Sequence, residues 1–295
     1  MQQELVILQA PSTLGLRTDG VAGLGARLMD LCLPEQLAAR MAAPVPVPGR
    51  DDAPDAETGI INMAAIAAFS PDLADAIGTI LDARGFPIVL GGDCTILLGS
   101  MLALRRRGHY GLLFIDGHAD FFQPEAEPNG EGASMDMAWV TGHGPRLLTD
   151  LEGLHPLVRA EDAVSFGFRD HEDQREYGGQ PLPSDLLVYD LPRLKEVGIE
   201  AAARAAIDHL TRPELEGFFI HFDADVLDDA VMPAVDFRVP DGLSLDDVVT
   251  VLRIAIASGK AVGIEVTIYN PTLDRDGRAG HDLVDVLVRA FAANG

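Results

Sequence analysis

Short apolar runs alternate along this chain with longer segments of helical periodicity, and this alternation constrains the fold more than any other feature. The runs carry no polar face, which is typical of strands in a parallel sheet that helices cover on both sides. Residues 281–293 show the helical pattern, with apolar residues at Leu283, Val284, Leu287 and Val288. We therefore predict an α/β fold with three αβα layers and a doubly wound, mostly parallel sheet.

The predicted elements follow this alternation from end to end. Ser244 is a good N-cap for one of the helices, because Asp246 and Asp247 follow in its first turn. The predicted strands are residues 5–8, 86–90, 111–116, 163–168, 186–189, 217–223 and 261–266. The predicted helices are residues 21–33, 71–84, 95–107, 198–210, 244–258 and 281–293.

Length and composition favour one compact unit. The chain has 295 residues, 47% of them hydrophobic, which is ample for one large core. It shows no internal repeat and no interdomain linker, so we predict a single catalytic domain over residues 1–295. The first residues indicate a β-strand rather than a signal peptide. The two cysteines, Cys32 and Cys94, are too few for a secreted disulfide scaffold and favour a reducing cytoplasm.

The net charge excludes two classes of partner. The formal charge of −24 repels phosphate backbones and anionic lipids, so we expect neither nucleic-acid nor membrane partners. No apolar stretch approaches the length of about 20 residues that spans a bilayer. A small-molecule partner remains the expectation.

Two predicted strands end in closely spaced metal-ligand residues. One runs into Asp116, His118 and Asp120, and the other into Asp223 and Asp225. Alternation along a strand places residues two apart on the same side. Buried carboxylates cost several kcal/mol each unless a cation compensates, so the two clusters together predict a shared metal site. Either cluster alone is equally compatible with a solvated loop start or a helix cap. Carboxylates with one imidazole make Mn²⁺ the natural candidate.

A long polar loop, residues 123–134, follows the first of these strands. In open α/β sheets ligands bind at the carboxyl ends of the strands. Within this loop, Asn129 and Ser134 are candidates to hydrogen-bond a substrate carboxylate.

Several motifs in order resemble those of the ureohydrolases, the family of arginase, agmatinase and formiminoglutamase. Residues 116–120 are similar to the family's Asp-Ala-His-x-Asp, and residues 223–228 to its Asp-x-Asp-x-x-Asp. Gly91-Gly-Asp-Cys94 resembles Gly-Gly-Asp-His, residues 166–170 resemble a Gly-Leu-Arg-Asp stretch near the substrate, and residues 263–271 resemble the final strand. The resemblance covers nearly the whole chain.

The resemblance implies an arginase-like sheet and two metal ions per chain that share Asp116 and Asp223. Asp120 would bind one ion, and His118 and Asp225 the other. A hydroxide bridging the ions would attack the guanidino or amidino carbon of a small substrate. Asp170 and Glu172 match positions near the substrate's amino group. The family resemblance also suggests a homo-oligomer, a trimer or a hexamer.

The chain departs from the family at three positions. Cys94 stands where a metal-binding histidine is usual, so a softer ligand or no ligand is expected there, and Ni²⁺, Zn²⁺ or Fe²⁺ become alternatives to Mn²⁺. Ile268 replaces the carboxylate that holds the guanidinium of arginine or agmatine, which weakens both as substrates. The proton-shuttling histidine of the loop is absent.

Four residues are therefore candidates for catalytic roles. Asp120 is a metal ligand, His143 or Asp136 would replace the missing proton shuttle, and Glu265 would stabilise the site. His221 alternates with Asp223 and Asp225, so it is either a residue directly behind the metal ligands or, more simply, a satisfied core histidine.

We thus predict a metal-dependent hydrolase of linear amidines, acting on a guanidino, hydroxyguanidino or formimino substrate. Cys94 and Ile268 keep an alternative open, a non-catalytic relative that acts as a regulatory subunit or small-molecule binder. A deacetylase-like amide hydrolase ranks third, because the chain lacks an adjacent pair of histidines.

Overall fold

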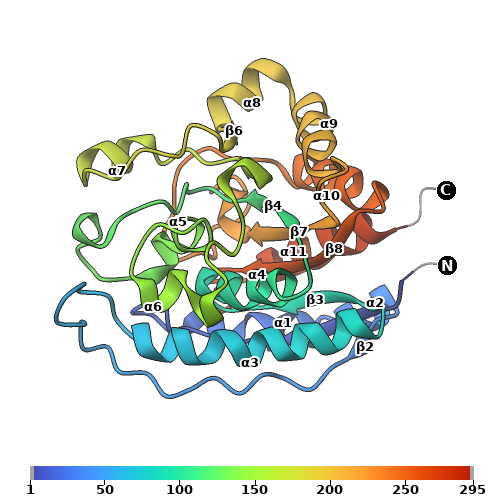
Figure 1. Cartoon of the computed structure of the whole chain (residues 1–295). Coiled ribbons are helices and arrows are strands. Elements are labelled where there is room, and N and C mark those ends of the chain that lie inside the picture. Colours follow the sequence, from blue (N-terminus) through green and yellow to red (C-terminus); the bar gives the residue numbers. More distant parts are fainter. Residues whose placement is uncertain (1–2, 293–295) are drawn as a thin grey trace.

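The computed structural model describes residues 3–292, which fold around one parallel β-sheet (Figure 1). The ends of the predicted domain (residues 1–2 and 293–295) and the last residue of the predicted helix 281–293 lie outside that range. Across the sheet the eight strands run in the order β2-β1-β3-β8-β7-β4-β5-β6, and every neighbouring pair is parallel. The strands are β1 Leu5–Gln9, β2 Arg40–Met41, β3 Phe86–Leu90, β4 Tyr110–Ile115, β5 Ala163–Phe166, β6 Leu187–Tyr189, β7 Gly217–Asp223 and β8 Ala261–Thr267.

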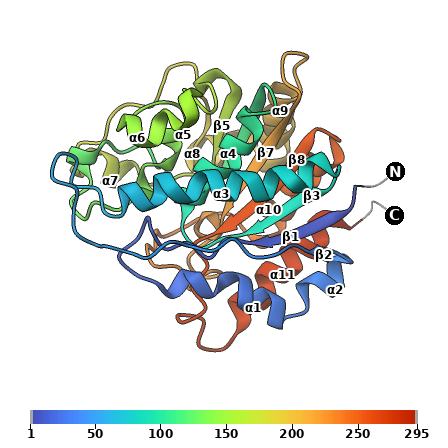
Figure 2. The ribbon, with the colours of Figure 1, turned by 60° about the horizontal axis from the view of Figure 1, so that its bottom comes forward.

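Helices cover both faces of the sheet and enclose two cores, which confirms the predicted three-layer α/β fold (Figure 2). In β4, Leu113 and Ile115 belong to one core, while Leu112 and Phe114 belong to the other. This alternation explains why the strands have no polar face. On one side lie α3 Met63–Asp82, α4 Leu97–Arg105, α5 Asp136–Val140 and α6 Arg146–Thr149; on the other lie α1 Leu24–Asp30, α2 Leu33–Leu37, α9 Ile199–Leu210, α10 Leu245–Ala257 and α11 Arg278–Phe291.

Helix α3 begins at Met63, well before the predicted start at residue 71. Pro71 lies inside the helix, where it removes one backbone donor. The segment that precedes it is rich in alanine and buries Ile66 and Phe69, and this packing extends the helix through the proline. The Ser70 hydroxyl donates a hydrogen bond of 2.8 Å to the carbonyl of Ile66.

By length and composition α3 is apolar enough to cross a membrane, contrary to the expectation that no stretch would be. Its environment is that of a covering helix. Leu73 and Ile77 are buried, and the helix packs against α4 and β3. Asp72 and Asp75 are carried on the other face, where Asp75 forms an ion pair with Arg106.

Replacing Leu287 by alanine tests the core beneath α11. Leu287 is fully buried in that core, so its truncation leaves a cavity. We expect the free energy of unfolding to fall by about 2–5 kcal/mol, measured by urea denaturation. The exposed Leu147 gives the matched control, because Leu147→Ala removes the same atoms from the surface. Equal stability of the two variants would contradict the packing described here.

Candidate metal centre

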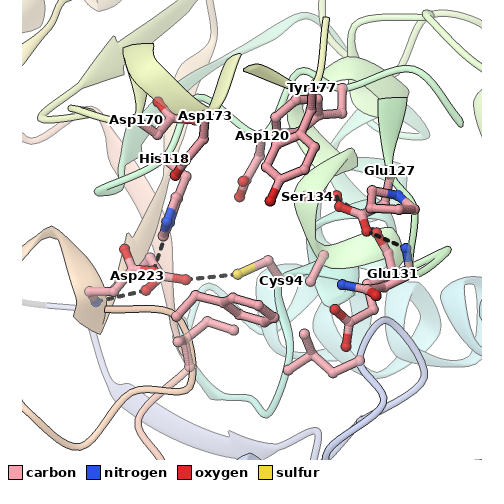
Figure 3. Close-up of a pocket in the computed structure, with 18 residues that line it drawn as sticks. Cys94, His118, Asp120, Glu127, Glu131, Ser134, Asp170, Asp173, Tyr177 and Asp223 are labelled. Carbon is pink, nitrogen blue, oxygen red and sulfur yellow. Dashed lines mark hydrogen bonds and ion pairs between the residues drawn. The ribbon is translucent and has the colours of Figure 1, made fainter. Parts of the chain in front are cut away.

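A pocket of about 220 Å³ opens beside the carboxyl ends of β3, β4, β7 and β8 (Figure 3). Its floor carries Cys94, Asp120 and Asp223, and its mouth is flanked by the half-exposed rings of Tyr177 and Phe237. The complete lining is Leu16, Cys94, His118, Asp120, Phe122, Glu127, Pro128, Asn129, Glu131, Ala133, Ser134, Asp170, Asp173, Tyr177, Asp223, Asp225, Phe237 and Ile268.

The segment after β4 supplies Asp116, His118 and Asp120. One donor atom from each of the three lies within 4.8 Å of the others. The turn is tight, because the backbone N–H of His118 donates a hydrogen bond of 2.6 Å to Asp116 Oδ1. A Cβ atom on Gly117 would lie 2.6 Å from the backbone oxygen of Asp225, so only glycine allows β4 and β7 to approach this closely here.

The end of β7 supplies Asp223 and Asp225. The backbone N–H of Asp225 donates to Asp223 Oδ1 at 2.8 Å, which fixes the first carboxylate. Asp225 Oδ2 lies 2.9 Å from His118 Nδ1. This contact joins the two clusters that the sequence predicted to share a site.

Cys94 follows β3 and faces the end of β7. Its Sγ lies 2.8 Å from Asp223 Oδ2 and 3.4 Å from Thr267 Oγ1. The preceding turn is held by Asp93, which accepts a hydrogen bond from the backbone N–H of Thr95. Burial, together with the Asp223 carboxylate, raises the pKa of the thiol well above its usual value, so the proton stays on sulfur unless a cation displaces it.

Charge in the cluster is poorly compensated by the protein alone. Burial raises the pKa of the Asp120 and Asp223 carboxyl groups well above the usual value. Burial opposes ionisation of His118 as well, but Asp225 beside it outweighs this effect and raises the pKa of the imidazole to about 10. Divalent cations would neutralise these groups in place of protons.

Two donor groups that share Asp116 fit a pair of metal ions. One consists of Cys94, Asp116, His221 and Asp223, and the other of Asp116, His118 and Asp120; within each, all donor atoms lie within 4.8 Å of one another. Asp116 Oδ2 and His221 Nε2 are buried and have no hydrogen-bond partner. Unpartnered buried polar atoms are costly, and a bound cation would satisfy both.

Removal of metal is expected to destabilise the protein. A site loaded at about 1,000 times its Kd contributes about 4 kcal/mol, or roughly 6–7 °C in Tm for a chain of 295 residues. We expect a chelator to lower the Tm by that amount and Mn²⁺ or Zn²⁺ to restore it, as measured by calorimetry. Mg²⁺ at equal ionic strength is the control. A Tm unaffected by chelation of metal-loaded protein would contradict the fit.

The other candidate catalytic residues lie outside the pocket lining. Asp136, at the start of α5, is fully buried beside Asp120, and neither of its oxygens meets a hydrogen-bond donor. Burial raises the pKa of both carboxyl groups, which favours their protonated forms while no cation is bound. Glu265 lies in β8, where it contacts His221 and Ser100. His143 is exposed, and its ring packs at an angle of 57° to that of Phe121, with ring centroids 5.1 Å apart.

Three of the four predicted substrate-binding residues line the pocket, and the fourth does not. Asn129, Ser134 and Asp170 line the pocket. Glu172 does not line it and is exposed on α7 His171–Glu176, whereas its neighbour Asp173 does. A short helix turns successive residues in different directions, so the sequence alone could not distinguish the two acids.

His221 is a buried core residue, as the sequence suggested, but its 3.5 Å contact with Asp116 Oδ2 was not predicted. The available signal was spacing, because His221, Asp223 and Asp225 alternate along one strand. The aromatic mouth formed by Tyr177 and Phe237 was not predicted either. These residues come from segments far apart in the chain, and no local pattern connects them.

Comparison with known proteins agrees with this geometry. The model of the arginase family matches residues 34–292. The arginase of Staphylococcus aureus (strain MSSA476) is 26% identical over 298 residues, which cover 97% of this chain and 96% of that protein.

Solved structures share the fold. The native arginase of Bacillus caldovelox aligns with a TM-score of 0.88 and 22% identity over 99% of both chains. The formimidoylglutamase of Bacillus subtilis aligns with a TM-score of 0.77 and 16% identity over 98% of this chain and 86% of that one. The resemblance stated from the sequence is therefore confirmed, and the chain belongs to the arginase family.

Proposed function

We propose that this protein is a two-metal hydrolase that cleaves a C–N bond at the guanidino or amidino carbon of a small substrate. The observation that carries the proposal is the pair of donor groups that share the buried Asp116 and present Cys94, His118, Asp120 and Asp223 to the pocket. Bound divalent ions would supply a nucleophile at neutral pH, because coordination lowers the pKa of water.

The protein's own residues have distinct tasks in this proposal. Asp116 and Asp223 hold the centre together, with His118 and Asp225 at one side and Cys94 at the other. Asp120 lines the pocket, and Asp136 lies buried behind it. Asp120 would take the proton that the attacking water releases and pass it to the leaving nitrogen, which is general acid–base catalysis.

The pocket wall indicates which substrates fit. Ile268 is apolar and lines the pocket at a φ of 68°, a conformation rarely adopted by β-branched residues. No carboxylate therefore stands there to pair with a strongly basic guanidinium. Among the described residues, the lining includes no lysine or arginine, whereas the buried Asp170 and the exposed Asp173 both belong to it. We infer a less basic reacting group on a substrate whose other end is cationic or neutral.

A substrate panel tests the proposal. The protein, loaded in turn with Mn²⁺, Zn²⁺, Ni²⁺ and Co²⁺, is incubated with guanidino, hydroxyguanidino and formimino compounds that carry amine, neutral or dicarboxylate ends. We expect release of urea, ammonia or formamide, fastest from compounds with an amine or neutral end. Exclusive hydrolysis of a dicarboxylate would overturn the substrate class, and no hydrolysis with any metal would favour a non-catalytic binder.

A further inference from the structure

His221 is held in one orientation at the centre of the sheet. The residue is completely buried in β7, and its ring stacks on Phe114 with centroids 4.4 Å apart. Its Nδ1 lies 2.7 Å from Glu265 Oε1. The second oxygen of Glu265 accepts a hydrogen bond of 2.5 Å from the Ser100 hydroxyl. The carboxylate is thus fixed from both sides, and the ring cannot turn without losing its partner.

This arrangement leaves Nε2 as the reactive side of the imidazole. A carboxylate accepts from a protonated ring nitrogen, so Nδ1 carries the hydrogen, and in the neutral imidazole that a metal binds the lone pair lies on Nε2. Nε2 has no hydrogen-bond partner, and Asp116 Oδ2, 3.5 Å away, has none either. Two ligand atoms around a tetrahedral zinc-type ion are separated by roughly 3.3–3.5 Å when each bond is about 2.0–2.1 Å.

We propose that His221 is a metal ligand, and that Cys94, Asp116, His221 and Asp223 form a four-donor site for a thiolate-binding divalent ion of the zinc class. The donor atoms of these four residues all lie within 4.8 Å of one another. Glu265 orients the imidazole, as carboxylates commonly do for metal-binding histidines. The inference rests on the proposed two-metal centre and assigns to it a ligand from the strand interior.

The variant His221→Asn isolates the nitrogen in question. The asparagine amide can still donate to Glu265 in place of Nδ1, but it has no atom at the Nε2 position. We expect the zinc content to fall from two ions to one per chain at equal free zinc, with at least a 100-fold loss of affinity at one site, beyond the 10–100-fold typical of residues that only orient a ligand. Equilibrium dialysis with elemental analysis measures both. His281→Asn, on the exposed start of α11, is the control.

If His221 has only a structural role, a different result is expected. Two zinc ions bound by a folded His221→Asn protein, with affinities within about threefold of the parent, would overturn the inference and leave the proposed function intact. Failure of the parent chain to bind two ions would overturn both.

If the variant does not fold, a crystal structure of the zinc-loaded parent protein, with anomalous scattering measured at the zinc edge, tests the inference instead. A zinc ion about 2.0–2.1 Å from His221 Nε2 supports the site, and a separation above about 3 Å from every ion excludes it.

Discussion

Replacing Asp116 by asparagine is expected to abolish hydrolysis, with kcat/KM reduced at least about 1,000-fold, which corresponds to about 4 kcal/mol of transition-state stabilisation. Asp116 belongs to both donor groups, so the substitution removes negative charge from both positions at once. The volume of the side chain is preserved, and Oδ1 still accepts the N–H of His118. Loss of activity should therefore accompany loss of metal rather than loss of fold.

Elemental analysis and a Tm measurement separate these two causes. We expect metal content to fall below one ion per chain and the chelated variant to be at least as stable as the chelated parent, because one buried charge is gone. Asp72→Asn, on the exposed face of α3, is the matched control and should retain activity and metal. An Asp116→Asn protein that keeps two ions and full activity would refute a shared ligand.

The second large effect concerns Cys94. Cys94→Ala removes the only sulfur of the centre among the described residues, and we expect at least a 100-fold loss of affinity for one ion. Cys94→His introduces the ligand usual in the family, so it should retain two ions. The expected distinction is spectroscopic. Cobalt-loaded parent protein should show a thiolate-to-metal charge-transfer band that is absent from both variants.

The two substitutions also have a decisive negative result. If the cobalt spectrum of the parent has no thiolate band and is unchanged in Cys94→Ala, Cys94 is a buried residue that does not bind the metal. The 2.8 Å contact between its sulfur and Asp223 would then be a hydrogen bond only. Activity measurements alone would not separate these roles, because both variants alter packing at the pocket floor.

The sequence predicted the sheet well because its strands are buried on both faces. Residues 86–90 and 217–223 match β3 and β7 at both ends. The two-residue strand β2, Arg40–Met41, was not predicted, because an element so short has no periodicity. The position of Pro71 inside α3 was missed for another reason: tertiary packing of Ile66 and Phe69 outweighs the local preference of proline.

Site residues could be predicted where they lie at the end of a single strand. Contacts between residues of different strands could not be predicted from the sequence. Asp116 and Asp223 could be predicted because acids directly after apolar runs are unusual. The role of His221 depends on Glu265 from β8 and on Asp116 from the segment after β4. The residues next to His221 in the sequence indicate neither contact. Asp173 lines the pocket and Glu172 does not, and this difference depends on how the short helix α7 is oriented.

The scattered origin of the donor residues has a consequence for the order of folding. Cys94 and Asp116 follow β3 and β4, and Asp223 ends β7. Cys94 is brought to the other two residues only when β8 is inserted between β3 and β7. The complete set of donors therefore exists only when the last strand has paired. Metal should bind late and act mainly on the unfolding rate, with little effect on the rate of collapse. Bound ions would thus slow the unfolding of the completed sheet, and their loss would shorten the lifetime of the native state.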